Sequence, residues 1–227
     1  MLKPVAITVS TNFSDILPYS LENNRDFFKH WYIVTDEGDS ETIKIVEQLN
    51  DSRVSLLLYK FRGNVFTNQY GSPVRSAFDK GGAVRMAQKQ AYKDFPDSWY
   101  LVLDTDILIR SWRDFCIQNL ARDCIYGPAV RNDYKSLGDY KQGIIHYDRH
   151  LYKEECAIIG CFQLYYEKRY YEHSEKSDLC DNNFTNLWLK ENHKIIHITV
   201  DHLGYWAPEV PNTHRGRVLG NGFKIDD

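Results

Sequence analysis

Of the 227 residues, 43% are hydrophobic and 26% are charged, which excludes a disordered segment or a collagen-like fibre. A chain of this length can bury about 70% of its unfolded surface, so its core needs no disulfide or metal. The 28 lysines and arginines nearly balance the 31 aspartates and glutamates, so no overall positive field is available to hold a nucleic-acid backbone.

The first half of the chain alternates predicted strands with predicted helices. Short apolar, β-branched runs predict strands at residues 4–10, 31–35, 54–59 and 99–103. Apolar residues at helical spacing predict helices at residues 17–29, 40–50 and 80–92, and Asp39 can cap the second. Such alternation forces parallel pairing with right-handed crossovers, and it predicts an α/β fold. Residues 62–78 are polar and contain glycine, which predicts a long functional loop.

The second half of the chain is less regular and predicts a mixed sheet. Strands are expected at residues 124–130, 157–166 and 194–200, a helix at residues 178–191 and a loop at residues 131–149. No repeat and no linker rich in Pro, Gly and Ser divides the chain, so residues 1–227 are expected to form one domain. Within it, residues 212–227 are rich in Arg and Gly and predict a flexible tail.

The cysteines and the apolar runs bear on where the protein works. The five cysteines are an odd set without a C-x-x-C pair, which argues against a disulfide framework and a zinc knuckle. No stretch approaches the roughly 20 apolar residues of a membrane helix, and residues 10–12 turn polar too early for a secretory signal. We therefore expect a cytoplasmic protein with no transmembrane segment.

The sharpest motif is Asp104-Thr105-Asp106, directly after the predicted strand at residues 99–103. Ligands of α/β sheets bind beyond the carboxyl ends of the strands, and the alternation lets both carboxylates reach one crevice. Carboxylate oxygens of this kind suit Mg²⁺ or Mn²⁺, with phosphates completing the coordination. The plain alternative is a polar turn after a strand.

Further charged residues could take part in the same chemistry. Lys80 precedes Gly81 and Gly82 at a predicted helix start, so its ammonium and the N–H groups of that start could hold a phosphate or a sugar hydroxyl. The glycines would permit close approach of that ligand. Arg215 and Arg217 match phosphate geometry and could fold over a diphosphate. The alternatives are a solvated lysine and a merely basic tail.

Asp178 and Asp181 lie at i and i+3 on one face of the predicted helix at residues 178–191. One of them could be a general base, because a hydroxyl is a poor nucleophile until its proton is removed. The alternative is that both are charges favoured by the dipole at the helix start.

Five segments in chain order carry a resemblance to a known family. They are VSTN, VTDE, FDKGGA, WYLVLDTDILI and DHLG. This series resembles the GT-A nucleotide-sugar glycosyltransferases, above all their family-2-like group, from about residue 4 to about residue 217. The resemblance implies a GT-A fold, a Rossmann-like αβα sandwich with a central mixed, mostly parallel sheet. It also implies a nucleotide-binding half at residues 1–110 and an acceptor side at residues 111–211.

The same resemblance implies roles for residues around the cation. Asp104 would meet the ribose and the metal side, and Asp106 would coordinate Mn²⁺ or Mg²⁺ at the diphosphate. His202, at the end of the strand predicted at residues 194–200, would be a further ligand. Taken without the family, a histidine at a strand end is more often structural. Asp201 should point the other way if the strand alternation continues.

The remaining implied roles concern the nucleoside and the base. Ser10, Thr11 and Asn12 would lie beside the nucleobase and ribose, and Asp36 would accept a hydrogen bond from either, with a turn aspartate as its alternative. In the family the base belongs to a Glu-Asp pair, and here the matching place reads Cys180-Asp181. Asp181 therefore ranks before Asp178.

Together these features predict a metal-dependent glycosyltransferase of the hexosyl-transferring type. It would move a sugar from a nucleoside-diphosphate-sugar donor, with UDP as the expected nucleotide, to a hydroxyl acceptor with inversion. A glycan, a lipid-linked sugar and a modified nucleobase all remain open as acceptors. The rivals are a non-catalytic sugar-binding or nucleotide-binding module of the same fold, a haloacid-dehalogenase-type phosphatase, whose D-x-D-x-[TV] pattern fails at Leu108, and a nucleotidyltransferase, whose glycine-rich first loop is missing from residues 8–15.

Overall fold

The computed structural model describes residues 2–67, 73–75, 78–110, 116–151, 160–173 and 177–203, without the side chains of residues 66–67, 74–75 and 177–179. The strands are β1 (Val5–Val9), β2 (His30–Asp36), β3 (Val54–Tyr59), β4 (Val65–Thr67), β5 (Pro73–Arg75), β6 (Tyr100–Leu103), β7 (Ile107–Ile109), β8 (Ile125–Asp133), β9 (Tyr147–His150), β10 (Phe162–Tyr165) and β11 (His193–His202). The helices are α1 (Leu17–Asn24), α2 (Ser40–Leu49), α3 (Lys80–Asp94), α4 (Leu137–Gln142) and α5 (Ser177–Thr185). Short 3-10 turns are η1 (Arg25–Phe27), η2 (Ile117–Asn119) and η4 (Lys190–Asn192).

The first half of the sheet is parallel. Strands β3, β2, β1 and β6 lie side by side in this order, each parallel to its neighbours. Each is a short apolar run, and Val5, Ala6 and Ile7 of β1 are completely buried at the centre. The predicted α/β class is confirmed, because helices connect these strands as the alternation of patterns requires.

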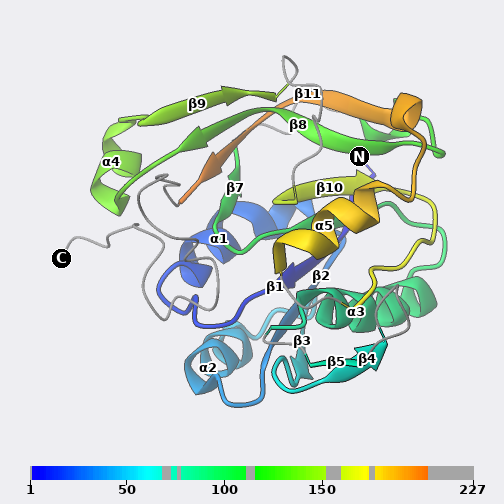
Figure 1. Cartoon of the computed structure of the whole chain (residues 1–227). Helices are drawn as coiled ribbons and strands as arrows, with labels where there is room; N and C mark the ends of the chain where they lie inside the picture. Colours follow the sequence, from blue (N-terminus) through cyan, green and yellow to red (C-terminus); the bar gives the residue numbers. More distant parts are fainter. Residues whose placement is uncertain are drawn as a thin grey trace.

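The second half of the sheet is mixed. Strand β10 runs antiparallel between β6 and β8, β11 lies parallel to β8, and β7 and β9 pair antiparallel with β11 and β8. Of the nine strands that the described residues contribute to this sheet, six (β1, β2, β3, β6, β8 and β11) run in one direction. This confirms the predicted Rossmann-like, mixed and mostly parallel sheet. Figure 1 shows β8, β9 and β11 forming a layer at the top of the view.

Each face of the parallel half is covered by helices. On one face, Ala6, Ile33 and Leu101 belong to a cluster that includes residues of α1 and α2. On the other face, Ile7 and Val102 belong to a cluster that includes residues of α3 and α5. Successive strand residues thus alternate between two apolar layers, as a strand buried on both faces requires.

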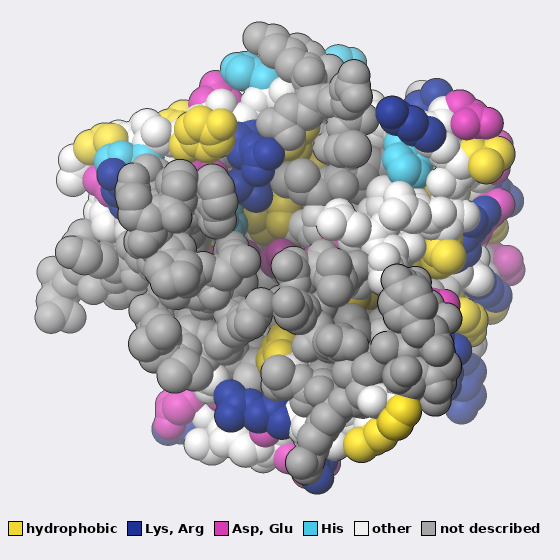
Figure 2. Space-filling model, in the orientation of Figure 1, with side chains coloured by type: hydrophobic (Ala, Val, Ile, Leu, Met, Phe, Trp, Pro, Cys, Tyr) yellow, Lys and Arg dark blue, Asp and Glu magenta, His cyan; other side chains and the backbone are white. Residues whose placement is uncertain are grey.

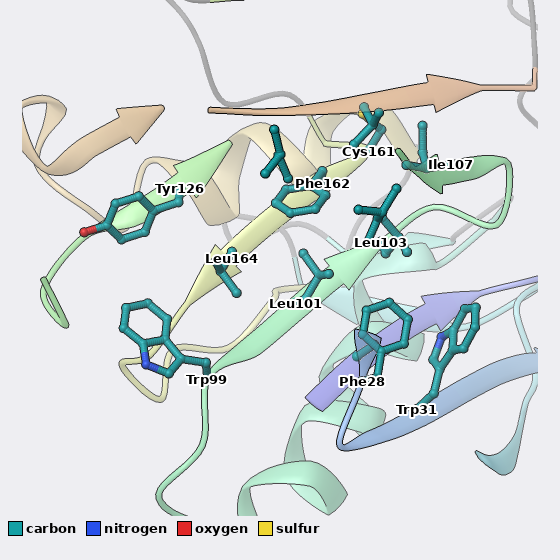
Figure 3. Close-up of a cluster of buried hydrophobic side chains, with 14 of the residues drawn as sticks. Phe28, Trp31, Trp99, Leu101, Leu103, Ile107, Tyr126, Cys161, Phe162 and Leu164 are labelled. Atoms are coloured by element: carbon teal, nitrogen blue, oxygen red, sulfur yellow. The ribbon is translucent and has the colours of Figure 1, made fainter. Parts of the chain in front are cut away.

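The first of these clusters extends from β6 into the mixed half. Figure 3 shows Leu101, Leu103, Ile107, Cys161 and Phe162 lying together between the strands. The backbone at residues 104–106 is therefore bounded by buried side chains on both sides. Because the flanking side chains are tightly packed, the backbone positions of Asp104 and Asp106 are fixed.

Several predicted boundaries are wrong, and the reasons are local. The expected loop at residues 62–78 contains the β4–β5 hairpin. The expected loop at residues 131–149 contains α4 and β9. Helix α4 is capped by Ser136, whose Oγ accepts from the Asp139 N–H, and by Gly143 with φ 71°. A serine cap and a left-handed glycine are sequence signals that periodicity over six residues does not reveal.

The predicted helix at residues 178–191 ends early. Helix α5 stops at Thr185, because Asn182, Asn183 and Thr185 are poor helix formers and Leu189 is extended. Strand β7 was not predicted, since three residues after a turn give too short a pattern.

None of the helices in the described ranges is both long and apolar enough to cross a bilayer. Figure 2 shows acidic and basic side chains interspersed on one face.

Asn24 closes one edge of the sheet. This residue is completely buried at the end of α1. Its Nδ2 donates to the Ile107 carbonyl at 2.7 Å, and its Oδ1 accepts from the Ile109 N–H at 2.9 Å. The side chain therefore pairs with the backbone of β7 as another strand would, and it satisfies groups that an unprotected edge would leave open.

We predict that Asn24→Ala lowers the free energy of unfolding by about 2–4 kcal/mol. The reason is that two buried backbone groups of β7 lose their partners, at about 1–3 kcal/mol each. Urea unfolding followed by circular dichroism measures the change. Asn119→Ala, at an exposed position of η2, is the matched control and should change little. Equal losses in both variants would contradict the prediction.

Candidate active site

The candidate site lies where the strand order reverses. Strand β1 pairs with β2 on one side and with β6 on the other. The helix after β1 covers one face of the sheet, and the helix before β6 covers the other. In open α/β sheets, ligands bind at such a switch point beyond the carboxyl ends of the strands. Ser10 and Asp104 are the first residues beyond these two ends.

Lys80 joins two of the predicted carboxylates. Its Nζ lies 2.9 Å from Asp104 Oδ1 and 2.9 Å from Asp181 Oδ2. The Lys80 residue is only 8% exposed, whereas the Asp104 side chain is 34% exposed. Burial alone would lower the pKa of the Lys80 ammonium, but the charges of Asp104 and Asp181 raise it well above its usual value. The ammonium stays charged and links the end of β6 to α5.

Asp181 is held on its other side by neutral partners. The Tyr171 hydroxyl lies 3.1 Å from Asp181 Oδ1 and also contacts Gln163 Oε1. Burial, followed by the nearby charge of Asp181, raises the pKa of Tyr171 well above its usual value, so the phenol keeps its proton. Gln163 Nε2 donates to the Asp181 carbonyl at 3.1 Å and to Thr185 Oγ1 at 2.8 Å. The carboxylate therefore has a fixed orientation.

The same surroundings shift the proton affinity of Asp181. Burial raises the pKa of Asp181 to about 6, although Lys80 lowers it, and the charge of Asp104 raises it further. A carboxyl group with this pKa is mostly ionised at neutral pH and can accept a proton.

Asp106 belongs to a second charged group, distinct from that of Asp104. His202 lies at the end of β11, and its Nε2 is 3.3 Å from Asp106 Oδ2. Its Nδ1 is 2.8 Å from Asp133 Oδ1, and all three side chains are at most 5% exposed. Burial alone would lower the pKa of His202, but Asp106 and Asp133 raise it to about 9. Asp201 points to the other side of the strand, where it accepts from Arg110 and Asn132, as the alternation predicted.

The spacing between Asp106 and His202 fits a divalent cation. Adjacent ligands of an octahedral ion with bonds of about 2.1 Å lie about 3.0 Å apart, close to the 3.3 Å observed here. Within the described part of the chain, no three His, Cys, Asp or Glu side chains form a complete metal site. Proteins usually hold Mg²⁺ by one or two carboxylates, with substrate phosphates and water completing the shell, and Asp106 is the carboxylate here.

The residues after β1 form the third part of the site. The Ser10 and Thr11 hydroxyls are buried and have no hydrogen-bond partner among the described residues. Asn12 has φ 59°, and its N–H donates to Asp39 Oδ2 at 2.7 Å. Asp39, which also caps α2 as predicted, thus sets the course of the chain beyond β1.

Asp36 is engaged in a turn. Its Oδ1 accepts from the Gly38 N–H at 2.9 Å, and its Oδ2 lies 3.4 Å from the Phe61 nitrogen. This matches the turn role that the sequence left open, at the end of β2 beside the site.

The helix start at Lys80-Gly81-Gly82 is partly occupied by the chain itself. Asp79 caps α3, and its Oδ1 accepts from the Gly82 N–H at 2.9 Å. A Cβ on Gly81 would lie 1.8 Å from the Glu172 carbonyl oxygen. The two glycines therefore admit residues 172–173 of the chain itself, and only the Lys80 ammonium faces the carboxylates.

Three predicted residues receive no placement. Arg215, Arg217 and the predicted tail at residues 212–227 lie outside the described residues, and the side chain of Asp178 is not described.

Other participants escaped the sequence reasoning. Asp79 stands directly before a predicted helix, so a cap rule could have found it. Gln163, Arg131 and Asp133 have no local signal that distinguishes them from core or surface residues.

No family model and no curated protein sequence matches the chain. Among solved structures, the chain is similar to a putative glucose-1-phosphate thymidylyltransferase from Bacillus anthracis in complex with a sucrose, with a TM-score of 0.44 and 10% sequence identity. The match covers 100% of this chain and 98% of that chain. At this TM-score and identity the likeness carries no functional weight, and function rests on the site.

We predict that Gly81→Ala lowers the free energy of unfolding by about 1–3 kcal/mol, because its Cβ would overlap the Glu172 backbone. The sign is diagnostic, since glycine to alanine inside a helix otherwise stabilises by about 1 kcal/mol. Chemical denaturation measures the change. Gly38→Ala, where the nearest atom to the new Cβ is Asp36 Oδ1 at 3.3 Å, serves as the control and should change less. A stabilised Gly81→Ala would show that residues 172–173 do not lie against α3.

Proposed function

We propose that the protein is a metal-dependent glycosyltransferase that moves a sugar from a nucleoside-diphosphate-sugar to a hydroxyl acceptor. The observation that carries the proposal is the division of the D-x-D pair at the switch point. Asp104 contacts the buried Lys80, which also holds Asp181, and Asp106 faces His202. The motif thus reaches both Asp106 and His202, a pair of side chains spaced to bind a cation, and Asp181, a carboxylate of raised pKa. Metal-dependent sugar transfer needs both kinds of group.

Asp106 and His202 would hold Mn²⁺ or Mg²⁺, and Asp104 would face the ribose and the metal side. When bound, the cation supplies Lewis-acid stabilisation of the charge that develops on the departing nucleoside diphosphate. The buried walls around Asp106 strengthen any such electrostatic effect, because the local dielectric constant is low.

The nucleoside would lie along the ends of β1 and β2. The Ser10 and Thr11 hydroxyls are available as hydrogen-bonding groups, and buried polar groups without partners are costly unless a ligand satisfies them. Asn12 and Asp36 flank the same strand ends. In this proposal UDP is the nucleotide, residues 1–110 bind it, and residues 111–211 supply His202, Asp181 and the acceptor side.

Asp181 would act as the general base in an inverting transfer. Lys80 and Tyr171 each occupy one of its carboxylate oxygens. The Cys180 thiol also donates to Oδ1, so Oδ2, with two acceptor sites and Lys80 at one of them, is the oxygen that can still accept a proton from the acceptor hydroxyl. Lys80 would hold the carboxylate in place and partly offset the negative charge that Asp104 adds.

We predict that one of UDP, GDP, CDP and dTDP binds tightly only when Mn²⁺ is present. Asp106→Ala and His202→Ala should each weaken this binding about tenfold or more, since each removes one of two protein ligands. Isothermal titration calorimetry measures the affinities, and circular dichroism checks that each variant is folded. Asp97→Ala is the control, because Asp97 is exposed and lies before the amino end of β6, away from the site.

Unchanged binding in both variants would refute the cation assignment. Binding that ignores Mn²⁺, without sugar transfer, would favour a non-catalytic module. No binding to any nucleotide would favour the phosphatase alternative.

We predict that Asp181→Asn leaves donor binding intact and slows transfer by about 10²-fold or more, the scale of losing a general base. In the wild type, kcat/KM should fall about tenfold per pH unit below pH 6, because protonation of Asp181, with its pKa of about 6, removes the base. Release of the nucleoside diphosphate from its sugar donor measures both effects. Asp178→Asn is the comparison, and loss of transfer in that variant alone would reverse the ranking of the two residues.

A further inference from the structure

We propose that Asp133 and Arg131 are positioning residues that set the orientation and proton position of His202 for cation binding. This inference rests on the proposed function and deepens it. Neither residue was expected from the sequence to take part in the site. Both lie on β8, the strand beside β11.

Strand pairing brings Asp133 and Arg131 of β8 to the face of His202, and Asp106 reaches His202 from the turn before β7, so that the four side chains form a row. In the parallel register of β8 and β11, Asp133 is the partner of His202. In the antiparallel register of β11 and β7, His202 is the partner of Ile107, the residue after Asp106. The Leu203 N–H also donates to the Asp106 carbonyl at 2.8 Å. Side chains on adjacent strands at paired positions project from the same face of the sheet.

The contacts run continuously from the D-x-D motif to Arg131. His202 Nε2 lies 3.3 Å from Asp106 Oδ2, and Nδ1 lies 2.8 Å from Asp133 Oδ1. Arg131 Nε lies 2.9 Å from Asp133 Oδ1, and its Nη2 lies 3.1 Å from Oδ2. The Nη2 contact is a hydrogen bond, whereas Nε is close to Oδ1 but makes no hydrogen bond, so Arg131 holds Asp133 by one hydrogen bond and by its charge.

The two ring nitrogens of His202 therefore face different tasks. Nδ1 has the shorter contact and a geometry suited to donating its proton to Asp133. Nε2 has the longer contact, at a spacing typical of neighbouring metal ligands. A cation that binds beside Asp106 would displace the proton from Nε2, while Asp133 keeps the other proton on Nδ1, so that the ring presents the lone pair of Nε2 as a metal-ligating histidine must.

Burial argues against a purely stabilising role for this row. Asp133 is 1% exposed and the Arg131 side chain 12% exposed. Buried ion pairs are weak sources of stability, because desolvation offsets most of the attraction. Asp201, 1% exposed on the same strand pair, provides a comparison, since it is ion-paired with Arg110 but points away from Asp106.

The test measures Mn²⁺ affinity by the electron paramagnetic resonance signal of free Mn²⁺, at saturating concentration of the nucleotide that the wild type binds best. Asp133→Asn should weaken Mn²⁺ binding about 10- to 100-fold, the usual effect of removing the partner of a metal-ligating histidine. Arg131→Gln should weaken it less. Asp201→Asn, which removes an equally buried carboxylate from the other face, should leave the affinity within about twofold.

A double-mutant cycle separates positioning from a general effect on stability. In a His202→Ala background, Asp133→Asn should have no further effect on Mn²⁺ affinity, because Asp133 acts only through the ring. If Asp133→Asn does not fold, ¹⁵N–¹H correlation spectra of the wild type with Mg²⁺ and nucleotide decide the matter. The expected result is a neutral His202 ring protonated at Nδ1.

Three results would overturn the inference while leaving the proposed function standing. These are a wild-type Mn²⁺ affinity in Asp133→Asn, additive losses in the cycle, and a ring protonated at Nε2 in the Mg²⁺ complex. A wild-type protein that binds no Mn²⁺ with any nucleotide would instead overturn the proposed function, and this inference with it.

Discussion

The buried ammonium of Lys80 is the constraint on which the rest of the site depends. A cation removed from water is costly unless opposite charges surround it. Lys80 meets this requirement with Asp104, from the end of β6, and Asp181, from α5. Helix α3, strand β6 and helix α5 are thereby fixed relative to one another at the carboxyl edge of the sheet. The apolar clusters on both faces set the positions of the backbones, and the ion pairs set where their ends meet.

Close approach of the backbone follows from this arrangement. Residues 171–173 lie against the first turn of α3, where Gly81 leaves room for the Glu172 carbonyl. Tyr171 of the same segment reaches Asp181, and a Cβ on Gly160 would lie 2.2 Å from Asp181 Oδ2. The glycines therefore serve the packing of the chain around the carboxylates. Their absence of side chains is what allows a helix start, a strand end and a connecting segment to converge.

The D-x-D motif connects two electrostatic groups that would otherwise be separate. Asp104 turns toward Lys80 and Asp106 toward His202, while Thr105 between them donates to the Val9 carbonyl at 2.9 Å and ties the turn to β1. The edge strand β7 begins directly afterwards and is held by β11 and Asn24. Because these contacts fix the turn, its two carboxylates can point in different directions and each keeps its partner.

The sequence by itself determined the elements whose signal is local. The apolar runs predicted β1 and β3 within a residue, Asp39 was identified as a cap, and the position of Asp104 and Asp106 beyond a buried strand followed from the strand itself. Local patterns could not reveal that β10 lies antiparallel between β6 and β8. Nor could they reveal that Lys80 meets Asp181 across 101 residues, or that His202 meets Asp133 across 69. Periodicity and capping act over a few residues, whereas these contacts exist only once the sheet has closed and burial forces each charge to find a partner.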